Sequence, residues 1–171
     1  MELISVIILS IKIICIKNKE NCNMGYETRD ELKGFGFDKA QVGDIRVMNG
    51  VFRIVLDNVM ILPENSCNRD IRMMRCNELL LTIESPEIME VVEEGYKLYD
   101  ADGRLREEIP DRVVEADGYT GVWEQLPGGN VYSIDLDDNY KLVIDGVNER
   151  TYGINLKGTA DTESWERFLN I

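Results

Sequence analysis

The sequence predicts an α+β protein that is mainly antiparallel β, as a sheet or partly closed barrel, with a short N-terminal helix and a C-terminal helix. Apolar and polar residues alternate with a period of two over residues 51–62 and 76–83, which is typical of strands that bury one face. Three more alternating runs lie between residues 132 and 156, as expected of an antiparallel meander. The 171 residues suffice for one domain with its own hydrophobic core.

The first 23 residues differ in composition from the rest of the chain. Residues 3–16 are almost wholly apolar, but this run is shorter than the roughly 20 residues of a membrane-spanning helix, and Lys12 interrupts it. Glu2 stands where a signal peptide carries a basic residue, and no small-residue cleavage site follows. Met24 opens a run typical of a natural start. We therefore interpret residues 1–23 as an extension or a misassigned start, with a membrane anchor as the alternative, and residues 24–171 as one β-rich domain.

The body begins with a short helix and a hairpin. Residues 27–33 fit a helical turn, because Thr28 can cap it and Glu31 completes a capping box. Residues 41–57 alternate on both sides of Asn49-Gly50, a dipeptide typical of tight hairpin turns. The runs 51–62 and 76–83 should then pair as antiparallel neighbours, with the polar segment between them presented to solvent.

The second half of the body is predicted as strands and turns. A strand over residues 88–92 precedes a second hairpin over 96–109, and 121–126 is a short strand with Trp123. The meander follows, with strands at 132–136, 140–144 and 152–156.

A helix is predicted at the C-terminal end, over residues 162–169. Asp161 fits the N-cap position, and Trp165, Phe168 and Leu169 fall at i, i+3 and i+4 on one face. Such a helix would cover the apolar face of the meander.

Charge and residue types limit the function classes. The formal net charge of −13 repels nucleic acid and anionic membranes and favours a basic partner. The chain has no histidine, which removes Ser-His-Asp and Cys-His nucleophilic sites and almost every catalytic zinc site. The four cysteines are irregularly spaced, so we expect free thiols in a reducing cytoplasm, with a Cys67–Cys76 bridge as the alternative in an oxidising compartment. No cofactor is implied.

Three short motifs resemble ligand sites, and each also fits a turn or a solvated surface. The run from Asp100 to Gly103 resembles the start of a calcium loop, but its glycine comes too early, so a hairpin turn is predicted. Residues 127–130 lack the lysine and the following helix of a phosphate-binding loop. A cluster of carboxylates could hold Mg²⁺ or Ca²⁺, although the alternation places its strand residues on the solvent side; its members are Asp135, Asp137, Asp138 and Asp145.

The segment over residues 63–75 is the best candidate for a binding site. It gathers basic and amide side chains in an acidic chain, and it joins two strands of a rigid sheet. Arg69 and Arg72 could grip a carboxylate or a phosphate. The alternative is that the arginines pair with neighbouring acids while asparagine and serine fill turn positions. The candidate binding residues are Asn65, Asn68, Arg69, Asp70, Arg72 and Arg75, and no catalytic residue or metal ligand is assigned.

Two short motifs give a family resemblance. An aromatic-x-Asp segment, Phe35-Gly36-Phe37-Asp38, precedes the first hairpin, and a Trp-x-x-Phe segment, Trp165-Glu166-Arg167-Phe168, closes the chain. With these motifs the body resembles small uncharacterised bacterial β-rich proteins of the immunity type, which neutralise toxins of competing bacteria. Many such domains carry a histidine where this chain has Phe37. The resemblance implies no catalytic residues.

Two functions follow as hypotheses. The first is a small acidic, non-enzymatic, cytoplasmic binding protein of the immunity or antitoxin type, which holds a basic protein partner with strong salt dependence. The second is a divalent-metal or carboxylate-dependent enzyme that uses the hairpin from Asp135 to Asp145. The first is preferred because no catalytic groups converge in the sequence. Nucleic acid is not expected as a partner, and membrane contact is expected only if residues 1–23 act as an anchor.

Overall fold

The structure is a computed structural model that describes residues 25–169, so the predicted extension over residues 1–23 lies outside it. The helices are η1 (Leu32–Gly34), η2 (Ala116–Gly118) and α2 (Tyr119–Gln125). The strands are β1 (Tyr26–Arg29), β2 (Phe35–Gly36), β3 (Gln41–Met48), β4 (Val51–Asp57), β5 (Val59–Ile61), β6 (Met74–Cys76), β7 (Leu79–Glu84), β8 (Glu87–Glu93), β9 (Tyr96–Tyr99), β10 (Leu105–Ile109), β11 (Arg112–Val113), β12 (Val131–Leu136), β13 (Tyr140–Asp145), β14 (Thr151–Lys157) and β15 (Asp161–Trp165).

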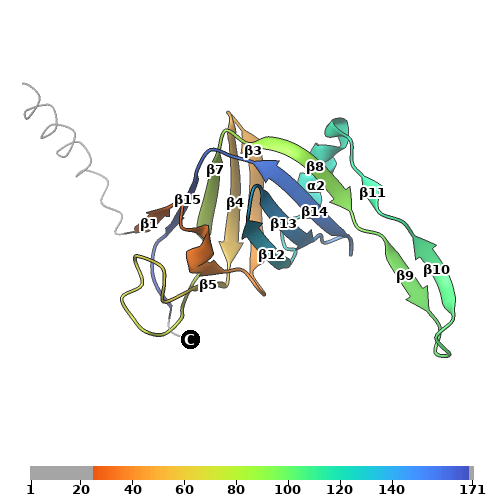
Figure 1. Cartoon of the computed structure of the whole chain (residues 1–171), viewed down its shortest axis with the longest axis horizontal. Helices are drawn as coiled ribbons and strands as arrows, with labels where there is room; N and C mark the ends of the chain where they lie inside the picture. The colour runs from red at the N-terminus through yellow and green to blue at the C-terminus, as the bar shows by residue number, and fades with distance from the viewer. Residues whose placement is uncertain (1–24, 170–171) are drawn as a thin grey trace, which may run out of the picture.

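Two five-stranded antiparallel sheets carry the fold (Figure 1). The first has the strand order β1-β15-β7-β4-β3 and the second β11-β8-β14-β13-β12. Both contribute to one hydrophobic core, with Phe52 and Leu81 from the first sheet and Leu142 and Ile154 from the second. The prediction of a mainly antiparallel β protein is confirmed. The sheets formed by residues 25–169 stay open and do not close into a barrel.

The first hairpin is confirmed. β3 and β4 are antiparallel, and Asn49 and Gly50 both have positive φ (54° and 70°), as a two-residue type I′ turn requires. β4 also pairs with β7, which confirms the predicted central pair. The strand predicted over residues 51–62 is broken at Asn58, whose φ of 59° turns the chain. The residues after this break form β5, which lies in a small sheet with β2 and β6.

The meander is confirmed with one correction. β12, β13 and β14 pair in order, and Ile134, Leu142 and Ile154 stand opposite one another on the core side. Tyr132 is predicted to share that face but is exposed. The register shifts just after Val131, and this irregularity buries Val131 and turns Tyr132 outward.

The helix predicted over residues 27–33 is wrong. Its first half is strand β1, which pairs with β15, and only the one-turn 3₁₀ helix η1 follows. Thr28 caps no helix, because its side chain is buried and its hydroxyl donates to Oε2 of Glu163 at 2.7 Å. A partner far along the chain therefore outweighs the local capping pattern.

The C-terminal helix predicted over residues 162–169 is also wrong. Residues 161–165 form β15, which is hydrogen-bonded to β1 on one side and to β7 on the other. Asp161, Glu163 and Trp165 alternate toward the interior and are buried. Because two of these three inward positions hold acids, the period of two is hidden in the sequence, and only the helical spacing of the apolar residues is visible.

The α-helix of the described residues lies where the sequence predicts a strand. α2 takes up most of the segment 121–126. Val122 and Leu126, one helical turn apart, are buried. Trp123 packs edge to face on Phe52 of β4, with ring centroids 6.2 Å apart. The segment therefore covers part of the core as a helix.

The hairpin over residues 96–109 is confirmed and forms an arm, β9–β10, that projects from the body (Figure 1). Two contacts fix its base. The Arg150 guanidinium lies over the ring of Tyr96, 5.0 Å from its centroid, and the N–H of Gly95 donates to Oδ1 of Asp111 at 2.7 Å. A side chain at Gly95 would overlap the carbonyl oxygen of Ile109. The two segments that form the base of the arm can therefore approach this closely only with glycine at position 95.

Candidate functional site

The candidate loop, residues 63–75, is organised by the buried side chain of Asn68. Its Nδ2 donates to the carbonyl oxygens of Ile61, Leu62 and Arg72 at 3.2, 3.1 and 3.0 Å. Its Oδ1 accepts the N–H of Asp70 at 3.0 Å. These hydrogen bonds engage both the NH₂ group and the oxygen of the side chain, so Asn68 shapes the loop.

Three more predicted residues also serve the structure of the loop. Asn65 and Asp70 each accept, on a side-chain oxygen, the backbone N–H of the residue two positions on, at 3.0 and 3.1 Å. Arg75 donates from Nη1 to Oδ1 of Asn58 at 3.3 Å. The Asn65 contact matches the part of the alternative in which asparagine fills a turn position, whereas Arg75 pairs with an amide and with no acid among the described residues.

Arg69 and Arg72 are the two predicted binding residues that stay free at the loop tip. Both are exposed, and no ion pair within residues 25–169 involves either of them. Ile71 between them is 91% exposed, and Met73 next to Arg72 is half exposed. The tip combines two cations with two uncovered apolar side chains, a composition that suits a protein contact.

A cleft of about 480 Å³ opens beside this tip. The rings of Tyr26 and Phe168, which meet edge to face with centroids 4.5 Å apart, line it together with Met74. Arg69 and the free thiol of Cys67 add polar groups. The cleft can therefore hold an apolar side chain beside a cation.

The carboxylates of the predicted metal site do not converge. Asp135, Asp137 and Asp138 are exposed, as the alternation predicts, and Asp145 at the other end of β13 accepts the hydroxyl of Thr151 at 2.7 Å. In the part of the chain that the structure describes, no three Asp, Glu, Cys or His side chains lie close enough to hold a metal ion.

The two other motifs form turns, as predicted. Oδ1 of Asp100 accepts the N–H groups of Asp102 and Arg104 at 3.0 and 2.8 Å, and Gly103 has a φ of 78°. In residues 127–130, the N–H groups of Gly128 and Gly129 donate to backbone carbonyls at 2.7 and 2.9 Å. Donors that are used inside the fold cannot cradle a phosphate.

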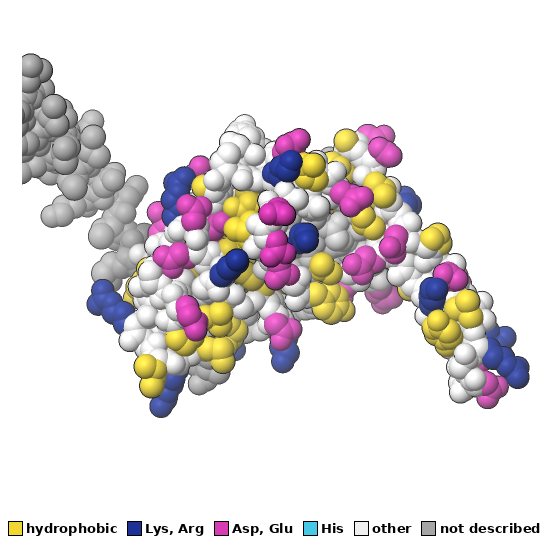
Figure 2. Space-filling view, viewed as in Figure 1, with side chains coloured by type: hydrophobic (Ala, Val, Ile, Leu, Met, Phe, Trp, Pro, Cys, Tyr) yellow, Lys and Arg dark blue, Asp and Glu magenta, His cyan; other side chains and the backbone are white. Residues whose placement is uncertain are grey.

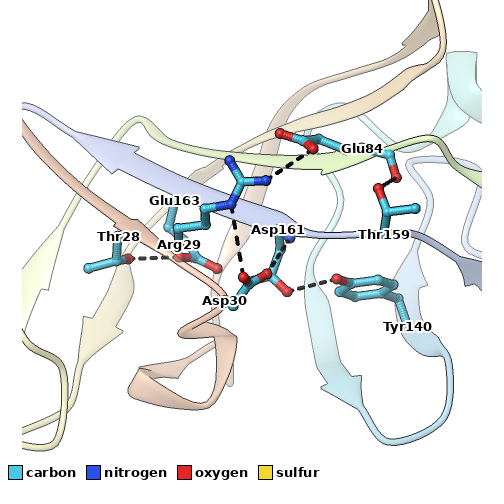
Figure 3. A network of polar contacts seen from close by, with 8 residues as sticks. All are labelled: Thr28, Arg29, Asp30, Glu84, Tyr140, Thr159, Asp161 and Glu163. Atoms are coloured by element: carbon cyan, nitrogen blue, oxygen red, sulfur yellow. Dashed lines mark hydrogen bonds and ion pairs between the residues drawn. The ribbon is translucent and has the colours of Figure 1, made fainter. Parts of the chain in front are cut away.

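Two buried acids on β15 belong to a polar network that sequence reasoning misses (Figure 3). Asp161 and Glu163 are 1% and 0% exposed. Tyr140 of β13 donates its hydroxyl to Oδ2 of Asp161 at 2.7 Å, and Thr28 of β1 donates to Oε2 of Glu163 at 2.7 Å. The other oxygens, Asp161 Oδ1 and Glu163 Oε1, are buried without a further donor.

A proton shared by the two carboxyl groups would give both remaining oxygens a hydrogen-bond partner. Burial, and then the hydrogen bond to Asp161, raise the pKa of Glu163 from 4.5 to about 8, a direction that favours a proton bound by the pair. Burial also raises the pKa of Tyr140 above its usual value, which keeps its hydroxyl a donor. Because solvent does not reach the pair, its role is to tie β15 to β1 and β13.

The arm is a second surface that sequence reasoning misses as a site. Leu98, Tyr99 and Leu105 are 49%, 60% and 49% exposed. The register places Tyr99 opposite Leu105, with Leu98 on the other face of the ribbon. Figure 2 shows apolar side chains interspersed with charged ones along the projecting ribbon. The alternation is visible in the sequence, but it is equally typical of a hairpin that faces a core.

Comparison of the chain with protein-family models, with curated proteins and with solved structures finds no match. The resemblance to immunity-type proteins therefore stays a prediction. Among residues 25–169, no helix has the length and apolar character that crossing a membrane requires.

Proposed function

We propose that the chain is a non-enzymatic binding protein that holds a basic protein partner, as immunity and antitoxin proteins hold theirs. The arm β9–β10 is the observation that carries this proposal. An isolated two-stranded ribbon is marginally stable in water, and its free strand edges and apolar side chains favour pairing with another chain. A partner that covers Leu98, Tyr99 and Leu105 would supply the burial that the ribbon lacks.

The charge of the chain favours a basic partner. The net charge is −13, and the arm with its base (residues 95–111) carries five acids against three bases. Only two of those acids, Asp100 and Glu108, form ion pairs within residues 25–169. Complementary charge across an interface speeds association and orients the partners, and salt weakens it.

The loop tip is the second contact surface in this proposal. Arg69 and Arg72 would pair with carboxylates of the partner, and Ile71 would enter an apolar pocket on it. Figure 1 places the loop over residues 63–75 at the opposite end of the body from the arm, so one partner would have to span the body to contact both surfaces.

We place this function in a reducing compartment, the cytoplasm. Cys67 and Cys76 are both free thiols, although only eight residues separate them in the sequence. Free thiols persist where the compartment is reducing.

The test is affinity capture from the native lysate with the tagged full chain, at low and high salt. We expect one basic protein at near-equal amounts, lost as the salt concentration rises. The variant Leu98→Thr/Leu105→Thr should lose it too, because the substitution removes apolar contact while keeping strand propensity. Val147→Thr is the control, since Val147 is 59% exposed and lies outside the arm. Capture that is unaffected by the arm variant, or an acidic partner, would contradict the proposal.

A further inference from the structure

A groove of about 400 Å³ crosses the outer face of the second sheet at the base of the arm. Its floor is one cross-strand row in which Gly153 of β14 stands between Val143 of β13 and Val92 of β8. Glu90 lies two positions before Val92 on β8, and Glu94 two positions after it. Lys141, Asn155, Gly95 and Asp111 complete the lining.

Gly153 has no reason within the fold to be glycine. Its φ is not positive, and a Cβ atom built on it meets only Glu94 Oε1, at 4.0 Å. Glycine in the middle of a strand costs stability, because it loses more conformational entropy on folding and packs no side chain. Such a glycine commonly marks a place where a ligand or another backbone approaches closely. The open space above Gly153 is therefore itself an indication of a bound chain.

The charges beside this row are negative and unneutralised. Glu90 and Glu94 take part in no ion pair within residues 25–169. Asp111 adds a third carboxylate, with one oxygen bound to the N–H of Gly95. The one cation in the lining, Lys141, is drawn toward Asp137, 3.9 Å away. A ligand with cations on both sides of an apolar centre would complement this arrangement.

We propose that the groove binds an extended basic segment of the partner protein, with an apolar side chain over Gly153 and a lysine or arginine beside each of Glu90 and Glu94. This inference rests on the proposed function and names the surface. Alternate residues of a strand lie about 6.6 Å apart on one face, so an extended segment presents side chains at the same spacing as Glu90, Val92 and Glu94. The matching sequence is Lys-x-Val-x-Lys. The groove is continuous with the arm through Gly95 and Asp111, so one partner can cover both.

The test is a fluorescence-anisotropy titration of the full chain with a labelled Lys-Thr-Val-Thr-Lys peptide at low salt. A scrambled peptide, Lys-Lys-Val-Thr-Thr, has the same composition and charge but cannot place both lysines beside the two glutamates. We expect the first peptide to bind with a dissociation constant of about 0.1 mM, and the scrambled one at least about tenfold more weakly.

Matched variants locate the binding. Gly153→Leu places a side chain in the groove from a position whose Cβ has open space, so it should weaken binding at least about tenfold with an unchanged or raised melting temperature. Gly121→Leu, at another glycine with open space around it, should leave binding unchanged. Glu90→Gln/Glu94→Gln should weaken binding, whereas Asp137→Asn/Asp138→Asn, which removes the same charge elsewhere, should not.

The proposal is overturned if the two peptides bind equally or if Gly153→Leu binds as well as the parent. It is also overturned if Glu90→Gln/Glu94→Gln and Asp137→Asn/Asp138→Asn weaken binding to the same extent. The last result would mean diffuse electrostatic attraction. The proposed function is tested separately from the groove by repeating the lysate capture with Gly153→Leu. A basic partner that this variant still captures would refute the groove and leave the proposed function standing. Groove-specific peptide binding without any basic partner in the lysate would refute the proposed function instead.

Discussion

Replacing Glu163 with glutamine should remove a pH dependence that the fold carries in its interior. The carboxamide has the shape of the protonated acid. Its oxygen can accept the hydroxyl of Thr28, and its NH₂ group can donate to Asp161. The variant therefore keeps the contacts of the neutral state and loses only the ability to ionise.

The sign and size of the effect follow from linkage. In the unfolded chain a glutamate ionises near its ordinary pKa of 4.5, whereas burial and Asp161 raise the pKa of Glu163 in the fold to about 8. Between these values the unfolded state has released the proton and the folded state still binds it. The folding equilibrium constant of the parent therefore falls about tenfold for each pH unit in this range. Below pH 4.5 the group costs nothing, and above pH 8 its full cost remains. Between about pH 5 and pH 8 the loss is on the order of 4 kcal/mol.

The assay is urea denaturation of parent and variant from pH 5 to pH 9, and the quantity to follow is the difference between their unfolding free energies. Titrating groups that do not contact Glu163 are common to both proteins and cancel in this difference, which therefore reports the titration of the Asp161–Glu163 pair. The unfolding free energy of the variant should increase relative to that of the parent as pH rises to about 8, and the difference should then stay constant. Glu166→Gln, at an exposed position three residues on, should show no such gain. A difference that is flat across this range, or that falls with pH, would refute the shared proton.

Two further predictions concern the buried Tyr140 and the two cysteines of residues 25–169, Cys67 and Cys76. Tyr140→Phe removes the hydroxyl that donates to Oδ2 of Asp161 and should lower the free energy of unfolding by about 1–3 kcal/mol in urea denaturation. Tyr99→Phe, at an exposed position, should not. Equal stability of the two variants would show that the bond between the sheets contributes little. In the native protein, maleimide should label Cys67 and spare Cys76, because burial raises the pKa of the Cys76 thiol to about 12. Peptide mapping by mass spectrometry measures both rates, and faster labelling of Cys76 would contradict its burial.

The elements that sequence reasoning predicts correctly are those set by neighbouring residues. Asn49 and Gly50 adopt the positive φ angles of a tight turn, and the alternating runs on either side then pair in one register. The β12–β14 meander follows the same logic, since each short turn brings the next alternating strand beside the last. Tyr132 is the exception, because a register irregularity leaves no mark in the polarity pattern.

The elements that sequence reasoning gets wrong depend on partners far along the chain. Thr28 and Asp161 fit helix caps locally, but each finds its partner across the fold, in Glu163 and Tyr140. Their segments pair with each other as strands β1 and β15, and no local preference encodes that pairing. The energy of a buried strand that is hydrogen-bonded to a neighbour on each side exceeds the roughly 0.5–2 kcal/mol of a helix cap.

The candidate site also has a part that the sequence predicts and a part that only the tertiary structure shows. Sequence composition alone selected the loop over residues 63–75, and it identified Arg69 and Arg72 as its cations. Only the tertiary structure showed that side chains of Asn65, Asn68 and Asp70 hydrogen-bond to the backbone of the loop, because hydrogen-bond partners are fixed by three-dimensional proximity. The same holds for the arm and for the groove around Gly153. Alternation specifies that a strand has two faces, but the packing of the whole chain decides which faces are covered and which remain free for a partner.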